Sequence, residues 1–335
     1  MSGQSRTFNP SHASDGGRSM LKQRGVSAVE PPAATDQAPA TCKLVYILGA
    51  GHSGSTLLSR LLGEVPGFFN AGEAGYNLFT KEQRDAEETP CGCGKPSGEC
   101  SFWAEIISGV PSRVRPYWRQ VERLGWSRRM LLALRGRRQT CSEDAVVASA
   151  MAAIYHRIAT KANCMVVVDA SKSATVAALL TGAPGIELYT VHLVRHPFGL
   201  VDSFSRTGEW LPRVMPMFEC VLKACWFQNV MFELVKGRAY WYRTLLYEDL
   251  VRNPASTLNG LVGQILSERV EMPFLRGRVA TLGFQHDLEG NGRVPRSGNV
   301  EIRPAEVRLR RWERHVVWLT TFPLLWHYGY FSNRM

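Results

Sequence analysis

Apolar, β-branched runs alternate with stretches of helical periodicity along most of this chain. Such runs predict buried strands, and the stretches between them predict amphipathic helices. The expected strands begin at Leu44 and cover residues 68–70, 164–169, 187–194 and 240–247. Helical patterns cover residues 53–63, 101–162, 213–236 and 304–320, and the Gly-rich stretch 283–298 is expected to be a loop. This alternation predicts a three-layer α/β fold, a mostly parallel central sheet flanked by helices.

Polar residues follow the predicted strands. Asp169–Lys172, Arg195 and Glu248 each come directly after an apolar run, as do the glycines from Gly49 onward. Parallel strands end at one edge of their sheet, where ligands bind in open α/β folds. We therefore expect these segments to share one site.

The stretch after the first strand has the pattern of a phosphate-binding loop. Gly49, Gly54 and Thr56 fit the spacing G-x-x-x-x-G-K-[ST], but Ser55 occupies the lysine position. Small residues let backbone N–H groups approach an anion, and the following helix adds its positive dipole end. Without the lysine that clamps β- and γ-phosphates, the loop favours a phosphate-like ligand over phosphoryl transfer. A tight turn with no ligand is the alternative.

The formal net charge of +11 favours anionic ligands or partners. Nine arginines and one acid, Glu122, lie between Arg113 and Arg138. A solvated basic helix face is the first interpretation of this segment, an acidic acceptor or peripheral membrane contact the second, and nucleic acid the third. No nucleic-acid-binding motif accompanies the run, so we expect no nucleic-acid partner.

The first 41 residues are rich in Ser, Gly, Ala and Pro and show no apolar periodicity. We interpret residues 1–41 as a disordered tail and residues 42–335 as one domain. A transit peptide is a minor alternative for the tail. No run reaches the length of a transmembrane helix, and the N-terminus has no apolar signal region. A cytoplasmic bacterial enzyme is the simplest interpretation.

Three cysteines form the only cluster of that residue type. Cys91, Cys93 and Cys100 supply three sulfurs, without a C-x-x-C spacing and without a histidine nearby in the sequence. A structural zinc site needs four ligands. A compact loop with reduced or disulfide-paired cysteines is therefore favoured over a metal site.

These features together resemble the sulfotransferases that use 3′-phosphoadenosine 5′-phosphosulfate (PAPS). The loop at 49–56 is similar to the family's 5′-phosphosulfate loop, and Arg195-His-Pro with Ser203 is similar to its 3′-phosphate motif. Tyr247-Glu-Asp-Leu followed by Asn253-Pro254 resembles another recurrent segment. Distant similarity to the tyrosylprotein sulfotransferases, in a bacterial branch, rests on these segments: Gly72-Glu73, Cys91-Gly-Cys-Gly, Cys100-Ser-Phe-Trp103, Asp169-Ala-Ser-Lys172, His286, Gly290-Asn291-Gly-Arg293 and Tyr328-Gly-Tyr330.

The resemblance implies a P-loop-like sulfotransferase fold and a set of site residues. Glu73 would be the catalytic base, Lys172 would stabilise the bridging oxygen, and His52 stands where many relatives carry Arg or Lys. A protonated His52 would serve as that cation, so activity is expected to fall as pH rises through its titration. The residues expected to hold PAPS are Gly51, His52, Ser53, Gly54, Ser55, Thr56, Arg195, Ser203 and Arg293. The late loop with His286 would cover the nucleotide.

The predicted reaction is an in-line sulfuryl transfer from PAPS to a hydroxyl group, with no metal required. The expected acceptor is a carbohydrate, glycolipid or small metabolite, and the basic segment leaves an anionic acceptor open. Loops and helices at 74–140 and 205–235 are expected to build its pocket. Two alternatives remain, a P-loop nucleotide kinase-like transferase and a non-catalytic basic binding protein.

Overall fold

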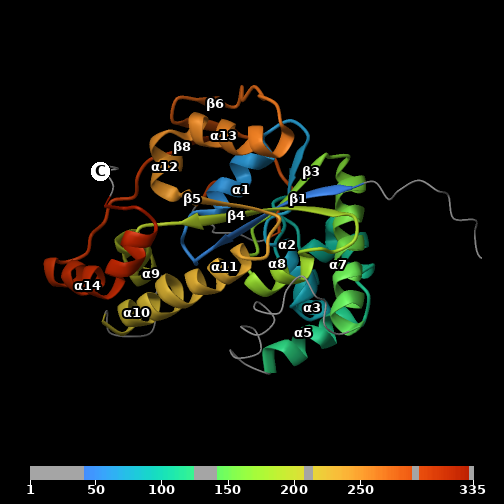
Figure 1. Cartoon of the computed structure of the whole chain (residues 1–335). Coiled ribbons are helices and arrows are strands. Elements are labelled where there is room, and N and C mark those ends of the chain that lie inside the picture. Colours follow the sequence, from blue (N-terminus) through green and yellow to red (C-terminus); the bar gives the residue numbers. More distant parts are fainter. Residues whose placement is uncertain (1–40, 124–141, 207–213, 289–293, 332–335) are drawn as a thin grey trace, which may run out of the picture. The chain divides into compact units, whose positions relative to one another are not determined.

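The computed structural model describes residues 41–123, 142–206, 214–288 and 294–331. The predicted tail lies outside these ranges except for Thr41, and the domain prediction for residues 42–335 remains a prediction. The centre of the fold is a five-stranded sheet in which each strand runs parallel to its neighbours (Figure 1). Its strands, in spatial order, are β2 (Phe68–Asn70), β3 (Val166–Asp169), β1 (Cys42–Gly49), β4 (Ile186–Val194) and β5 (Trp241–Leu246).

Helices cover both faces of this sheet, which confirms the predicted three-layer α/β class. Side chains of β1 alternate between the faces: Tyr46 lies in one hydrophobic cluster, and Val45 and Ile47 lie in the other. The Tyr46 face is covered by α2 (Ala74–Phe79), α4 (Trp103–Ser108), α5 (Val114–Arg123), α7 (Ser142–Ala162), α8 (Ala174–Leu180) and α11 (Asn229–Lys236). The opposite face is covered by α1 (Ser55–Gly63), α12 (Tyr247–Arg252) and α13 (Pro254–Leu266) (Figure 1).

A third apolar cluster lies where the chain leaves β4. It joins α9 (Pro197–Ser205), α10 (Val214–Glu219), the π-helical segment η2 (Cys220–Gln228) and α14 (Arg311–His327). The stretch 213–236, predicted to be helical, consists of α10, η2 and α11 in succession. Two short elements, α3 (Gln83–Glu87) and the 3₁₀ turn η1 (Ser97–Glu99), precede α4.

The predicted boundaries of the last helix are wrong. It was expected at 304–320, whereas α14 begins at Arg311 and ends at His327. The Glu313 side chain accepts a hydrogen bond from the Arg310 backbone N–H at 2.6 Å, a capping contact that sets the helix start. The Arg310 backbone is extended, and the Arg308 N–H donates to Asp202 Oδ1 at 3.0 Å.

A small antiparallel sheet was not predicted. It consists of β6 (Leu275–Arg276), β7 (Val279–Leu282) and β8 (Gly298–Glu301). Alternate residues of β7, Ala280 and Leu282, are buried in the cluster beneath α1. Strands this short carry little periodicity, so the sequence pattern alone did not reveal them. Among the described residues, no helix is both long enough and apolar enough to cross a membrane.

Candidate functional site

The expected site residues follow consecutive strands of the parallel sheet. Glu73 follows β2, Lys172 follows β3, the loop 50–54 follows β1, and Arg195 follows β4. After β1 the chain continues to β2, toward one edge of the sheet, and after β4 it continues to β5, toward the opposite edge. The ends of β1 and β4 therefore flank a topological switch point, the usual ligand-binding crevice of open parallel sheets.

The loop 50–54 closes tightly before α1. The Ser53 N–H donates to the Ala50 carbonyl at 3.0 Å, and Gly54 precedes the helix with φ of 97°. A Cβ on Gly54 would lie 2.5 Å from the Tyr247 ring, so only glycine fits this backbone and this contact. No side chain caps α1 and no acid lies in its first turn. The helix N-terminus therefore presents its N–H groups without a competing carboxylate.

Ser53 carries a hydroxyl that suits an anionic ligand. The residue is fully buried, and among the described residues its Oγ has no hydrogen-bond partner. A buried polar atom without a partner costs about 1–3 kcal/mol. A ligand oxygen accepting from Ser53 would remove that cost. The loop thus fits the phosphate-like group expected from its sequence.

Arg195 lies against the same loop. Its Nη1 donates to the His52 carbonyl at 2.7 Å, and its guanidinium carbon lies 4.5 Å from the centroid of the Tyr247 ring. Ser203 Oγ is 3.4 Å from His52 Nδ1. The structure therefore brings together the loop, Arg195 and Ser203, which the sequence places up to 151 residues apart. Arg293, also expected here, lies outside the described residues.

Glu73 and Lys172 form an ion pair between Glu73 Oε1 and Lys172 Nζ. Both side chains are about four-fifths buried, and Lys172 Nζ also donates to the Ala170 carbonyl at 3.1 Å. Lys172 has φ of 59°, an uncommon backbone conformation for a lysine. A carboxylate and an ammonium group thus lie in contact at neighbouring strand ends, where the sequence predicted a base and a cation.

Asp169 holds this pair in place, a role that the sequence analysis did not assign. Its carboxylate accepts from the Gly75 N–H at 2.6 Å, the Ser171 N–H at 2.7 Å and the Tyr155 hydroxyl at 2.9 Å. Burial raises the pKa of Asp169 above its ordinary value. The first two bonds fix the segments that carry Glu73 and Lys172. The sequence signal that could have indicated this role is a lone acid at the end of an apolar strand.

A cavity of about 390 Å³ adjoins the ion pair. Glu73 and Lys172 line it together with Gly51 of the loop 50–54, so the loop and the ion pair open into one space. Tyr76 and Trp118 line another part of the cavity. Among the described residues, the buried Trp118 Nε1 has no hydrogen-bond acceptor.

Two other strand-end residues hold the fold together. The Glu248 carboxylate accepts from the His196 N–H at 3.0 Å and from the Tyr330 hydroxyl at 2.8 Å. His196 Nδ1 accepts from the Phe198 N–H at 3.2 Å and caps α9, in agreement with its expected role as a turn residue. Glu248 thus joins α9 to Tyr330, and it lines a cavity beside Arg195 instead of the one beside Glu73.

The arginine-rich segment is only partly described. Arg119 pairs with Glu82 at 3.1 Å, whereas Arg115 is buried, with Nε and Nη2 lacking partners among the described residues. The burial of Arg115 differs from the solvated helix face that we first expected for this segment. Residues 124–138 lie outside the described residues.

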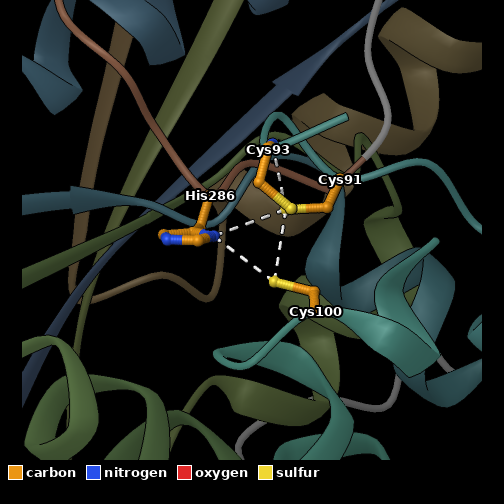
Figure 2. Close-up of side chains that lie close together, drawn as sticks. All are labelled: Cys91, Cys93, Cys100 and His286. Carbon is orange, nitrogen blue, oxygen red and sulfur yellow. Dashed lines mark hydrogen bonds between the residues drawn. The ribbon is translucent and has the colours of Figure 1, made fainter. Parts of the chain in front are cut away.

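The structure brings to the cysteine cluster a histidine that the neighbouring sequence lacks. His286 lies against Cys91, Cys93 and Cys100, with Nδ1 3.3 Å from Cys100 Sγ (Figure 2). The three thiols are unpaired, so no disulfide joins them. His286 had been expected in a loop over the nucleotide. It is 186 residues from Cys100 in the chain, a separation that no local pattern reveals.

No protein-family model matches the chain, and no curated protein matches it. Among the solved structures that are similar to it are three sulfotransferases. One is a sulfotransferase domain from the olefin synthase of Synechococcus PCC 7002, with 20% identity, coverage of 70% of this chain and 78% of that chain, and a TM-score of 0.41. The second is a sulfotransferase domain from the curacin biosynthetic pathway, with 18% identity, coverage of 69% of this chain and 76% of that chain, and a TM-score of 0.42. The third is the sulfotransferase STF1 from Mycobacterium tuberculosis H37Rv, with 12% identity, coverage of 68% of each chain, and a TM-score of 0.38. At these identities and TM-scores the similarity says nothing about what this chain binds.

Proposed function

We propose that the chain is a sulfotransferase that moves the sulfuryl group of PAPS to a hydroxyl of a carbohydrate, glycolipid or small metabolite. One observation carries the proposal: two anion-binding features meet at the switch point of the sheet. The loop 50–54 and Arg195 are in direct contact through the His52 carbonyl, 2.7 Å from Arg195 Nη1. PAPS has two separate anionic groups, one at the 5′ position and one at the 3′ position, and so calls for two such features.

The loop would hold the 5′-phosphosulfate. Gly51, Gly54 and the first turn of α1 supply backbone N–H groups, and the Ser53 hydroxyl is available for a new acceptor. The side chains of Ser55 and Thr56 add hydroxyl donors at the helix N-terminus. The serine at the P-loop lysine position argues against a nucleoside triphosphate as the donor.

Arg195 and Ser203 would hold the 3′-phosphate. A guanidinium group binds a phosphate with two parallel hydrogen bonds, and a hydroxyl adds a third. Arg195 also lines a cavity of about 440 Å³ whose walls include the aromatic side chains of Phe198 and Tyr247. An apolar, aromatic space next to a phosphate-binding arginine suits a nucleoside.

The Glu73–Lys172 pair supplies the groups that sulfuryl transfer needs. The acceptor hydroxyl would attack sulfur while the bridging oxygen leaves on adenosine 3′,5′-bisphosphate. Glu73 would accept the hydroxyl proton, and Lys172, with a protonated His52, would offset the charge on the leaving oxygen. The contact between Glu73 and Lys172 supports this division of roles because it places acid–base and electrostatic groups at one point.

The cavity of about 390 Å³ would receive the acceptor. Tyr76 and Trp118 offer apolar surface, and the unpartnered Trp118 Nε1 offers a hydrogen bond to a polar acceptor atom. This combination suits a molecule with both hydroxyl groups and an apolar face.

Calorimetric titration of the full chain with adenosine 3′,5′-bisphosphate, and separately with ATP, tests the donor site without metal. We expect tight binding of the bisphosphate and much weaker binding of ATP. Arg195→Ala should weaken bisphosphate binding roughly 100-fold, because two charge-assisted hydrogen bonds are lost. Arg84→Ala is the control, since the Arg84 side chain is 86% exposed and pairs only with Glu88 at 3.0 Å among the described residues.

Two results would contradict the proposal. Equal affinity for ATP and the bisphosphate would favour the kinase-like transferase. Absence of bisphosphate binding, combined with salt-sensitive binding of polyanions, would favour the basic binding protein.

A further inference from the structure

Four metal-binding side chains from distant parts of the sequence point toward one another. Cys91 and Cys93 lie in the loop after α3, Cys100 lies between η1 and α4, and His286 follows β7. Their donor atoms all lie within 4.8 Å of one another. Figure 2 shows the His286 ring facing the sulfur of Cys100 and the cysteine loop of Cys91 and Cys93. We propose that Cys91, Cys93, Cys100 and His286 bind one structural zinc ion.

The distances among Cys91 Sγ, Cys100 Sγ and His286 Nδ1 match those that tetrahedral zinc requires, and Cys93 Sγ lies within 4.8 Å of all three. Zn–S bonds of about 2.3 Å and Zn–N bonds of about 2.0 Å imply S···S near 3.8 Å and S···N near 3.5 Å. Cys91 Sγ lies 3.7 Å from Cys100 Sγ, and His286 Nδ1 lies 3.6 Å and 3.3 Å from these two sulfurs. A disulfide requires about 2.05 Å between sulfurs. The cluster therefore has the spacing of a metal centre instead of a disulfide.

The loop that carries Cys91 and Cys93 is held by its own backbone. The Cys91 N–H donates to the Lys95 carbonyl at 3.0 Å, and the Gly94 N–H donates to the Cys91 carbonyl at 2.9 Å. The Cys93 N–H points at Cys91 Sγ at 3.5 Å, a contact that favours a charged thiolate. Arg296 Nη1 donates to the Cys91 carbonyl at 2.8 Å and brings a cation to a site that would carry a net negative charge.

His286 is held with Nδ1 toward the sulfurs. Its ring stacks on Phe102 with centroids 5.6 Å apart, and Phe284 meets it edge-on at 5.4 Å. The Trp103 indole N–H donates to the His286 carbonyl at 2.6 Å. Because Phe102 and Trp103 lie two and three residues after Cys100, one short segment supplies a ligand and orients another. Such support by neighbouring side chains is typical of metal sites.

The donor set selects the metal and its role. Three thiolates and one imidazole are the ligands of structural zinc sites, where four protein groups fill the tetrahedral coordination. Cys91 and Cys100 are buried, and no fifth protein donor or open position is needed. The ion would therefore hold the fold and take no part in the transfer reaction.

The ion would anchor the segment that supports Glu73. The Glu73 N–H donates to the Leu288 carbonyl at 2.8 Å, two residues beyond His286, and the Gly92 N–H donates to the Asp287 carbonyl at 2.8 Å. Leu288 also forms isolated bridges with Gly72 and Cys91. Zinc would thus join the cysteine loop and the 286–288 segment beside the candidate base. The metal proposal does not depend on the identity of the sulfuryl donor.

Metal analysis of the full chain, with any affinity tag removed, tests the site. We expect about one zinc per chain, released when a mercurial reagent titrates the thiols. Cys100→Ser and His286→Ala should lose the metal, whereas His286→Cys should keep it because four soft donors remain. Cys164→Ser is the matched control, a half-buried cysteine outside the cluster, and should retain zinc fully.

Replacement of zinc by cobalt supplies an independent test on the wild-type chain, which needs no variant to fold. We expect the intense visible absorption of tetrahedral cobalt and a sulfur-to-cobalt charge-transfer band. Purified chain without metal that takes up neither zinc nor cobalt would overturn the proposal. Stoichiometric iron in place of zinc would also overturn it, as would a disulfide between two of the three cysteines Cys91, Cys93 and Cys100.

Discussion

Glu73 is the residue whose assigned chemistry is most open to a direct test. Glu73→Gln keeps the shape of the side chain and removes the proton acceptor. We expect kcat to fall about 10²- to 10⁴-fold, the usual contribution of a general base, while affinity for adenosine 3′,5′-bisphosphate stays unchanged. Turnover of PAPS with an acceptor found by screening measures the first quantity, and calorimetry measures the second.

The control for this substitution is Glu88→Gln, a surface carboxylate paired with Arg84. It should leave both quantities unchanged. Full activity in Glu73→Gln would remove Glu73 from the mechanism. A parallel loss of bisphosphate affinity would indicate that the residue supports the fold of the donor site instead.

At the scale of elements, His196 begins α9 and so links the strand end at Arg195 to the helix that carries Ser203. Its buried imidazole caps the helix as a hydrogen-bond acceptor, and burial lowers the pKa of His196 to about 4. The folded state therefore binds fewer protons than the unfolded state below the ordinary histidine pKa of about 6.5. The free energy of unfolding is expected to fall as pH drops from about 6.5 toward 4.

His196→Asn separates this titration from the other acid-sensitive groups. Asparagine keeps a cap acceptor but does not titrate, so the variant should lose less stability than the wild type across this pH range. Chemical denaturation at a series of pH values measures the difference between the two chains. Parallel curves would show that His196 protonation does not contribute to acid unfolding.

At the scale of the whole molecule, a buried ion pair joins α1 to the segment before Leu288. Arg60 Nη2 lies 3.1 Å from Asp287 Oδ2, and both side chains are at most 6% exposed. Arg60→Met should cost roughly 3–5 kcal/mol of unfolding free energy, because Asp287 would remain buried without its cation. Adding Asp287→Leu should recover part of that loss.

Chemical denaturation of the two single variants and the double variant gives the coupling energy. The exposed Arg84–Glu88 pair is the control, for which the same cycle should give about 0–1 kcal/mol. Additive losses at Arg60 and Asp287 would contradict the expected coupling. Zinc content is measured on each variant, since Asp287 is next to His286.

The elements that could be predicted from sequence are those with local signals. The run before Gly49, the small residues that follow it and the helix after Gly54 are all encoded within about twenty neighbouring positions, as are the strands at 164–169 and 187–194. Hydrophobic periodicity and the backbone preferences of glycine are local signals that span such distances. The three-layer class and the strand-end position of Arg195, Lys172 and Glu73 followed from them. The short strands of the second sheet did not, because glycines and charged residues such as Arg276-Gly-Arg278 leave no long apolar run there.

The tertiary structure decided which distant residues meet. Glu73 and Lys172 are 99 residues apart, and Cys100 and His286 are 186 apart. Their contacts arise because parallel strands bring their ends to one edge, and because packing of the 286–288 segment against Gly72 and Cys91 closes the cysteine cluster. By itself the sequence determined an α/β chain with a glycine-rich loop after its first strand and an arginine at the end of another strand. The ion pair of Glu73 with Lys172, the support from Asp169 and the histidine of the cysteine cluster depend on long-range packing, which no local pattern encodes.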